Sequence, residues 1–327
     1  MDAPTAIAWI LPEHAAYVTD AISLAGLELG AVGCPTRGET QGLADQLGVE
    51  PLTDLRAALA STDASLAILT AAGRDSAPID ARTVQAAEGR GVRLATTGPF
   101  TPGLIDAAEH GLFKEHAGTR PANAIHLVPR TRRHPVFRAA SEVIENFGPI
   151  DLISVESNAP PPCGALPSAL LAAIDTVLAL VGVPELVDAA APSAHKHVGD
   201  LSGHFAALLR FPDGRAGQIS ASDRAAWGWR ATLTGAAGRL TLRPSGFDWF
   251  DAGGNRMDEH RAEDRWRNPA EALAASLREL IEPSAPRGPA IGWIELLSTA
   301  EAALLSTRTG QAESPATILR AAHSTSD

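Results

Sequence analysis

The sequence predicts an α/β protein of two domains. The N-terminal domain is Rossmann-like, with a doubly wound parallel sheet, and the C-terminal domain is α+β, with an open, mostly antiparallel sheet. Two observations predict this class. Over residues 5–96, short apolar runs alternate with helical patterns, as in repeated βαβ units. Between residues 186 and 250, short strands of alternating polarity are separated by glycine-containing turns, as in an antiparallel sheet.

The N-terminal domain is expected to span residues 1–120, with its boundary near Arg120-Pro121. Apolar runs predict strands at residues 5–10, 27–32, 65–70 and 92–96. Amphipathic patterns between them predict helices at residues 14–24, 38–47, 52–59 and 81–87. Strands that alternate with helices form parallel sheets, so this half is typical of a nucleotide-binding fold.

The C-terminal domain is expected to span residues 121–327. Two strands are predicted at residues 126–128 and 152–156, and two helices at 136–146 and 168–180. Four further strands form the open sheet, at residues 205–211, 216–222, 229–234 and 240–242. Two helices, at residues 269–281 and 291–306, close the chain.

Composition excludes several classes of protein. The 327 residues are 45% hydrophobic, which suffices for packed cores, and 38 acidic against 27 basic residues give a net charge of −11. Nucleic acid and anionic membranes are therefore not expected as partners. The chain has no apolar run of membrane-spanning length and no signal peptide at its start, and its two cysteines cannot form a disulfide framework. We expect a cytoplasmic protein.

Several landmarks follow one another in a fairly specific order. They are residues 132–135 and 148–150, the strand pair and glycine turn at 205–217, the hairpin at 231–240 with Gly235 and Gly238, and the helix at 295–310. Together they resemble the glucose–fructose oxidoreductase, inositol dehydrogenase and MocA family (Gfo/Idh/MocA). The resemblance implies the two-domain fold predicted above. It also implies NAD(P)-dependent oxidation of sugars or polyols, and subunits that pair through the C-terminal sheet.

The nucleotide-binding motif that this resemblance implies is missing. The first strand–helix turn reads Ile10, Leu11, Pro12, Glu13, and no glycine precedes Gly26. Glycines in this turn let the backbone approach the pyrophosphate at the helix N-terminus. Glu13 places a carboxylate there instead, and Cys34 stands where an acid would bind the ribose. We therefore expect no cofactor, and NAD(P) only if the family's function is retained.

The family's catalytic residues are missing as well. The resemblance implies a lysine at Gly98, an acid at Ser168 and a histidine at Ala172, counted back from Asp175. None of the three residues present has a side chain that can exchange a proton near neutral pH. We therefore expect no catalytic residue at these positions.

Two other groups of side chains could bind a ligand. His195, His197, Asp200 and His204 are weak candidates for a metal site, because alternate histidines of an extended segment point the same way. The alternative is a polar loop. A basic cluster could bind a carboxylate or phosphate, or could pair with Glu142 and Glu145; it consists of Arg130, Arg132, Arg133, His134 and Arg138.

Trp227 and Trp229 are two residues apart and would share one face of a strand. We expect them on the open face of the C-terminal sheet, in the interface of a homo-oligomer or of a hetero-oligomer with a homologue. The alternative is that both lie in the core of the chain.

Three hypotheses for the function follow. The favoured one is a protein that keeps the oxidoreductase fold but has lost NAD(P) binding and catalysis, and acts as a non-catalytic subunit, a partner-binding protein or a sensor. The second is an active NAD(P)-dependent sugar or polyol oxidoreductase with a rebuilt site. The third is a metal-dependent hydrolase or lyase that uses His195 and His197.

Overall fold

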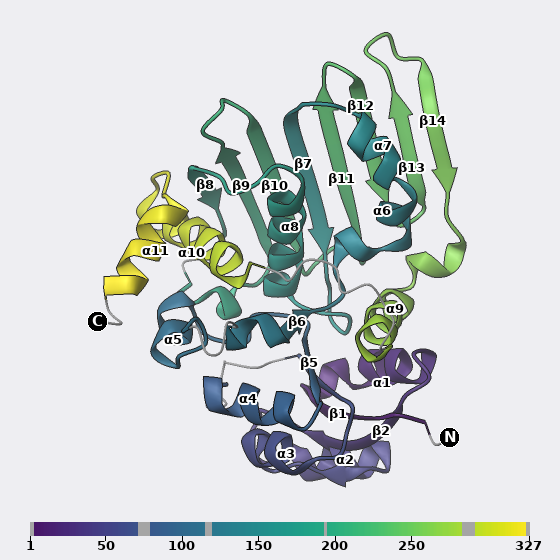
Figure 1. Cartoon of the computed structure of the whole chain (residues 1–327), viewed down its shortest axis with the longest axis vertical. Helices are drawn as coiled ribbons and strands as arrows, with labels where there is room; N and C mark the ends of the chain where they lie inside the picture. The colour runs from purple at the N-terminus through teal and green to yellow at the C-terminus, as the bar shows by residue number, and fades with distance from the viewer. Residues whose placement is uncertain (1–2, 71–78, 115–119, 193–194, 283–291, 325–327) are drawn as a thin grey trace.

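The computed structural model describes residues 3–70, 79–114, 120–192, 195–282 and 292–324. The chain forms a six-stranded parallel sheet, in the lower half of Figure 1, and an eight-stranded sheet above it. This arrangement confirms the predicted fold class.

The N-terminal sheet has the strand order β3-β2-β1-β4-β5-β6, and every pairing is parallel. The order reverses between β1 and β4, which is where α/β folds of this type bind ligands. The last strand pairs with β5, so the sheet continues past residue 120. The strands are β1 (Thr5–Trp9), β2 (Glu28–Gly33), β3 (Glu50–Pro51), β4 (Leu66–Leu69), β5 (Arg93–Thr96) and β6 (Ile125–Leu127).

The helices of this domain start and stop where local chemistry favours it. The side chains of Asp54 and Asp80 accept the backbone N–H groups of Ala57 and Thr83 and so cap two of them. The helix Thr40–Leu47 ends at Gly48, whose φ of 68° is a left-handed conformation that glycine adopts without strain. The helices are α1 (Ala15–Leu24), α2 (Thr40–Leu47), α3 (Leu55–Ser61), α4 (Ala81–Gly89) and α5 (Leu104–Glu109).

The C-terminal sheet has the order β14-β13-β12-β11-β7-β10-β9-β8. All neighbours pair antiparallel except β7 and β10, which are parallel. The strands are β7 (Ile150–Asn158), β8 (Leu186–Ala190), β9 (His204–Arg210), β10 (Ala216–Ser222), β11 (Gly228–Gly235), β12 (Gly238–Arg243), β13 (Gly246–Phe250) and β14 (Arg256–Arg261).

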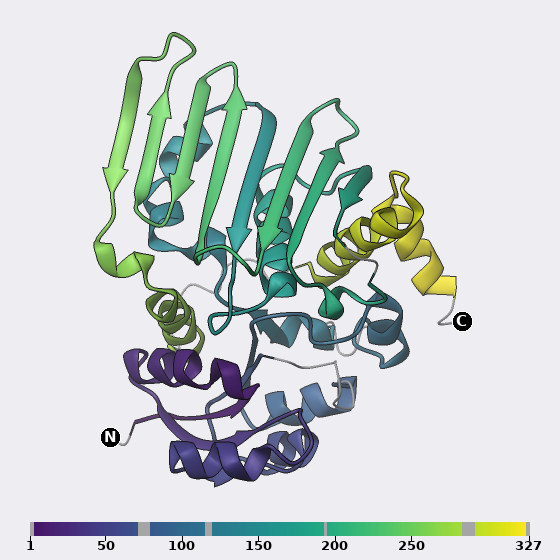
Figure 2. The ribbon, with the colours of Figure 1, turned by 180° about the vertical axis from the view of Figure 1, so that it is seen from behind.

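Helices cover one face of this sheet, and Figure 2 shows the opposite face free of them. Over the covered face lie α6 (Pro135–Ala139), α7 (Ser141–Asn146) and α8 (Leu166–Leu180). Near β8 lie α10 (Trp293–Thr309) and α11 (Pro315–Ser324). The remaining helix, α9 (Pro269–Ile281), packs against α1 and so joins the two domains. No helix in the described part of the chain is long and apolar enough to cross a membrane.

The position expected for Trp229 is wrong. Along β11 the buried side chains are Trp229, Ala231 and Leu233, whereas Arg230 is exposed. Trp229 is only 8% exposed and its ring lies 5.3 Å from that of Phe137 on α6. It therefore packs in the core under the helices, and cannot contribute to an interface on the open face.

Candidate functional site

The candidate site lies at the carboxyl edge of the parallel sheet, at the reversal between β1 and β4. Two pockets meet there, and Ser168 at the start of α8 lines both. We call the first, which lies between the domains, the arginine pocket, and the second the edge pocket. They contain about 850 Å³ and about 790 Å³ of open space, respectively.

A short 3₁₀ turn, Pro12–His14, replaces the glycine turn after β1 and leads directly into α1. Nδ1 of His14 lies 2.9 Å from the hydroxyl of Thr70, after β4, and its ring also hydrogen-bonds the backbone of Gly164, in the loop before α8. Burial lowers the pKa of His14. A neutral imidazole therefore lies over the N-terminus of α1, where a dinucleotide fold binds pyrophosphate.

A further pocket lies at the end of β2, lined by Cys34, Pro35, Thr36 and Arg37 together with Trp9. Gly33 lies beneath the indole of Trp9, so that a Cβ at Gly33 would approach this ring to 2.2 Å. Cys34 is buried, and its sulfur accepts the backbone N–H of Thr36 at 3.4 Å. Trp9 is buried, packs against the last residue of β2 and forms one wall of the pocket at this strand end, where a dinucleotide fold binds ribose.

The three positions at which the resemblance implies catalytic residues come together in space. A Cβ at Gly98 would lie 3.3 Å from Oγ of Ser168. Ser168 and Ala172 are one helical turn apart on α8 and both line the arginine pocket. The three side chains offer no acid, base or ammonium group.

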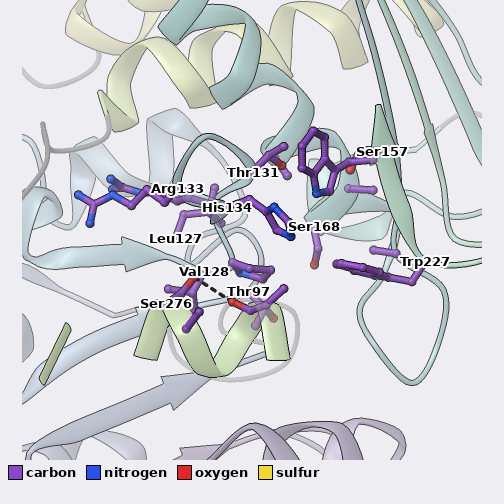
Figure 3. A pocket seen from close by; sticks show the side chains of 18 of the residues that line it. Thr97, Leu127, Val128, Thr131, Arg133, His134, Ser157, Ser168, Trp227 and Ser276 are labelled. Carbon is purple, nitrogen blue, oxygen red and sulfur yellow. Dashed lines mark hydrogen bonds between the residues drawn. The ribbon is translucent and has the colours of Figure 1, made fainter. Parts of the chain in front are cut away.

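The arginine pocket is built from both domains. Its walls come from the turn before α6, the ends of β7 and β11, and the faces of α8 and α9. In Figure 3, Arg133 lies on one side and Trp227 on the other, with His134 and Ser168 between them. The pocket therefore has a basic end and an aromatic end.

The basic cluster forms ion pairs with other helices. Arg132 contacts the buried carboxylate of Asp175 on α8 at 3.0 Å, and Arg133 pairs with Glu279 on α9. The sequence suggested Glu142 and Glu145 as partners, but it could not show that α8 and α9 lie closer. Arg130 is buried, and this burial lowers its pKa to about 10, so it stays protonated at neutral pH.

His134 does not add to the positive charge of this cluster. It is buried beside the rings of Trp229 and Trp266, and burial lowers its pKa to about 4. Its Nδ1 accepts the backbone N–H of Val136, and its Nε2 lies 3.4 Å from the carbonyl oxygen of Trp266. The ring is neutral and both nitrogens are in contact with the backbone, which suits a structural role.

The metal candidates do not form a cluster. His197 and Asp200 line the edge pocket, whereas His204 begins β9 as an exposed residue. Among the described residues, no three His, Cys, Asp or Glu side chains are arranged to hold a metal ion. Cys163 lines the arginine pocket, and burial raises the pKa of its thiol, which disfavours a nucleophilic role.

Sequence reasoning missed the contribution of α9. Ala272, Ala275, Ser276 and Glu279 all line the arginine pocket. Their spacing of three to four residues places them on one face of the helix. That periodicity is visible in the sequence, but it does not reveal what the face contacts.

Comparison with known proteins identifies the fold. No protein-family model matches the sequence, and no curated protein matches it. Solved structures do match over nearly the whole chain. An oxidoreductase from Agrobacterium radiobacter in complex with NAD+, L-tartaric acid and magnesium has a TM-score of 0.67 and 14% identity, covering 97% of this chain and 100% of the other. The chain has the Gfo/Idh/MocA fold.

Two further structures support this assignment. Levoglucosan dehydrogenase in complex with NADH and levoglucosan has a TM-score of 0.68 and 14% identity, and the match covers 96% and 99% of the two chains. A myo-inositol dehydrogenase from Corynebacterium glutamicum has a TM-score of 0.64 and 18% identity, and the match covers 96% of this chain and 99% of the other. The predicted Gfo/Idh/MocA resemblance is confirmed at the level of the fold.

Proposed function

We propose that this chain is a non-catalytic protein with the Gfo/Idh/MocA fold, which binds a small molecule between its domains and acts as a sensor, a partner-binding protein or a non-catalytic subunit. One observation carries the proposal. Gly98, Ser168 and Ala172 lie where the two pockets meet, and none of them can hold or move a proton. A bound polyol would find no base at these three positions.

The loss of NAD(P) binding rests on separate contacts. At the end of β2, Cys34 stands in place of the acid that would bind the ribose. At the edge above α1, His14 hydrogen-bonds the hydroxyl of Thr70 and the backbone of Gly164. A dinucleotide in the pose usual for this fold would have to displace these groups and break their hydrogen bonds. The solved structures of this fold include complexes with NAD+ and NADH, so the usual pose is the relevant comparison.

Calorimetric titration with NAD+, NADH, NADP+ and NADPH tests the first part of this proposal. We expect no binding in the micromolar range to any of the four. Levoglucosan dehydrogenase titrated with NADH under the same conditions is the positive control. Micromolar binding of one nicotinamide form to this chain would favour the alternative, an oxidoreductase with a rebuilt site.

Absorbance at the nicotinamide band, with myo-inositol and levoglucosan as substrates, tests the second part. We expect no turnover. If turnover is found and survives purification, the Ser168→Ala and His14→Ala variants locate it, because these residues line the edge pocket. A rate lost in either variant would contradict the proposal.

A further inference from the structure

The charged side chains of the arginine pocket are unbalanced. Arg130, Arg133 and Arg138 line it together with one carboxylate, that of Glu279. Three guanidinium groups and one carboxylate leave a local charge of +2 in a chain whose net charge is −11. The neighbouring pair of Arg132 and Asp175 adds one charge of each sign and leaves this surplus unchanged.

Part of this positive charge is withdrawn from water. Arg130 is 6% exposed; the carboxylates of Asp175 and Glu279 stabilise its charge, whereas Arg132 and Arg133 oppose it. A buried guanidinium group with like charges near it is costly unless anionic groups offset it. A bound anion would add a further negative charge near these guanidinium groups, in a site where water screens the attraction between opposite charges poorly.

The rest of the lining suits an organic molecule rather than a bare ion. Leu127, Val128 and Ala169 are buried residues of the wall, and Trp227 presents a half-buried indole. Arg133 and Trp227 lie on opposite sides of the pocket in Figure 3.

From these features we infer that the arginine pocket binds a small organic carboxylate with a flat apolar body. The guanidinium groups hold the carboxylate by charge-assisted hydrogen bonds, and the ring of Trp227 packs against the apolar body. This inference rests on the proposed function in one respect: the ligand is bound and not turned over. It differs from a polyol site in needing a negative charge.

Benzoate is the probe, and benzamide, which has nearly the same shape and no charge, is its control. Binding is measured by ligand-observed NMR titration at low ionic strength. We expect benzoate to bind at least about tenfold more tightly than benzamide, because charge-assisted hydrogen bonds are roughly twice as strong as neutral ones. No benzoate binding at about 10 mM, or equal binding of the two, would overturn the inference.

A double variant links binding to the pocket. Arg133→Gln with Arg138→Gln lowers the lining charge from +2 to 0. The control, Arg82→Gln with Arg120→Gln, removes the same total charge from exposed positions outside the pocket. We expect the first to weaken benzoate binding about tenfold or more and the second to leave it unchanged. Equal effects would overturn the inference, provided that thermal unfolding shows both variants folded.

The result of the benzoate titration is independent of the result of the cofactor titration. If NADH and benzoate both bind, the proposed function fails and the carboxylate site stands. If neither binds, the carboxylate site fails and the non-catalytic assignment stands.

Discussion

Replacing Glu301 by glutamine should change how the stability of the protein depends on pH. Glu301, on α10, is partly buried and accepts the backbone N–H of Leu104, the first residue of α5. Burial raises its pKa from 4.5 to about 7, and the nearby carboxylate of Asp106 adds to this effect. The glutamine oxygen can accept the same N–H without carrying a charge.

The direction in which stability changes with pH follows from the protons that the folded and unfolded chains bind. Between pH 4.5 and about 7, folded Glu301 holds a proton that the unfolded chain has released. The stabilising contribution of the protonated form is therefore complete at low pH and is lost as pH rises to about 7. A shift from 4.5 to about 7 corresponds to at most about 3 kcal/mol.

His134 acts in the opposite direction. Burial holds its pKa at about 4, against 6.5 in the unfolded chain, so its contribution is lost as pH falls from 6.5 to about 4. The two contributions offset each other between pH 4.5 and 6.5 in the wild type. In Glu301→Gln this offset is removed, and the loss from His134 alone amounts to about 2–3 kcal/mol across that window. The lowered pKa of His14 acts in the same direction.

Urea unfolding of both proteins at several pH values from 4.5 to 8 measures the difference. Glu301→Gln should be more stable than the wild type at pH 8, by up to about 3 kcal/mol or about 4 °C in Tm for a chain of this length. The two should converge at pH 4.5. Glu295→Gln, an exposed carboxylate on the same helix, is the control. A difference that stays constant over this range, or grows toward low pH, would refute the reasoning.

Three other outcomes are expected. Trp229→Ala should lower the free energy of unfolding by about 3–5 kcal/mol, because a buried aromatic is removed; a loss below about 1 kcal/mol in urea would contradict the core position. Arg132→Ala should cost about 3 kcal/mol, because it removes the cation that contacts the buried carboxylate of Asp175 at 3.0 Å; unchanged urea stability would argue against this pair. We still expect an oligomer that forms through the C-terminal sheet. Leu208→Asp, at a 59% exposed position of β9, should lower the mass measured by light scattering, whereas Leu24→Asp, 43% exposed on α1, should not; a monomeric wild type would contradict the expectation.

The sequence predicted best those elements that are buried on one face. Strands at residues 205–211 and 216–222 were found within one residue, as β9 and β10, because exposed and buried side chains alternate strictly along them. The helix expected at 168–180 is α8, which starts two residues earlier.

Elements without such a pattern were missed. Every residue of β14 is exposed, so the sequence of this edge strand lacks the alternation of apolar and polar residues from which a strand is predicted. The strand β3 has only two residues. The helix expected at 136–146 is divided into α6 and α7 at Ala140. Alanine has a high helix propensity, so the sequence does not predict a break at this position.

The site was predictable only where the residues lie close in the sequence. The spacing of Ser168 and Ala172 identified one helical turn. By contrast, His14 and Gly164 are 150 positions apart, and no local pattern indicates that they touch. The same limit explains the error for Trp229. Alternation shows that one face of a strand is buried, but it does not show which face the helices cover.

A dehydrogenase must bind both a dinucleotide and a substrate, and in this chain different residues line the places for the two. His14 and its partner Thr70 lie at the strand ends where the pyrophosphate of a dinucleotide would lie. The arginine pocket lies beyond Ser168 and is lined by α8 and α9, so these contacts do not close it. A ligand in that pocket would lie beside Ser168 and Ala172, neither of which can take up its proton. On this geometry, loss of the reaction does not require loss of the binding site. For that reason the cofactor titration and the benzoate titration can give different answers.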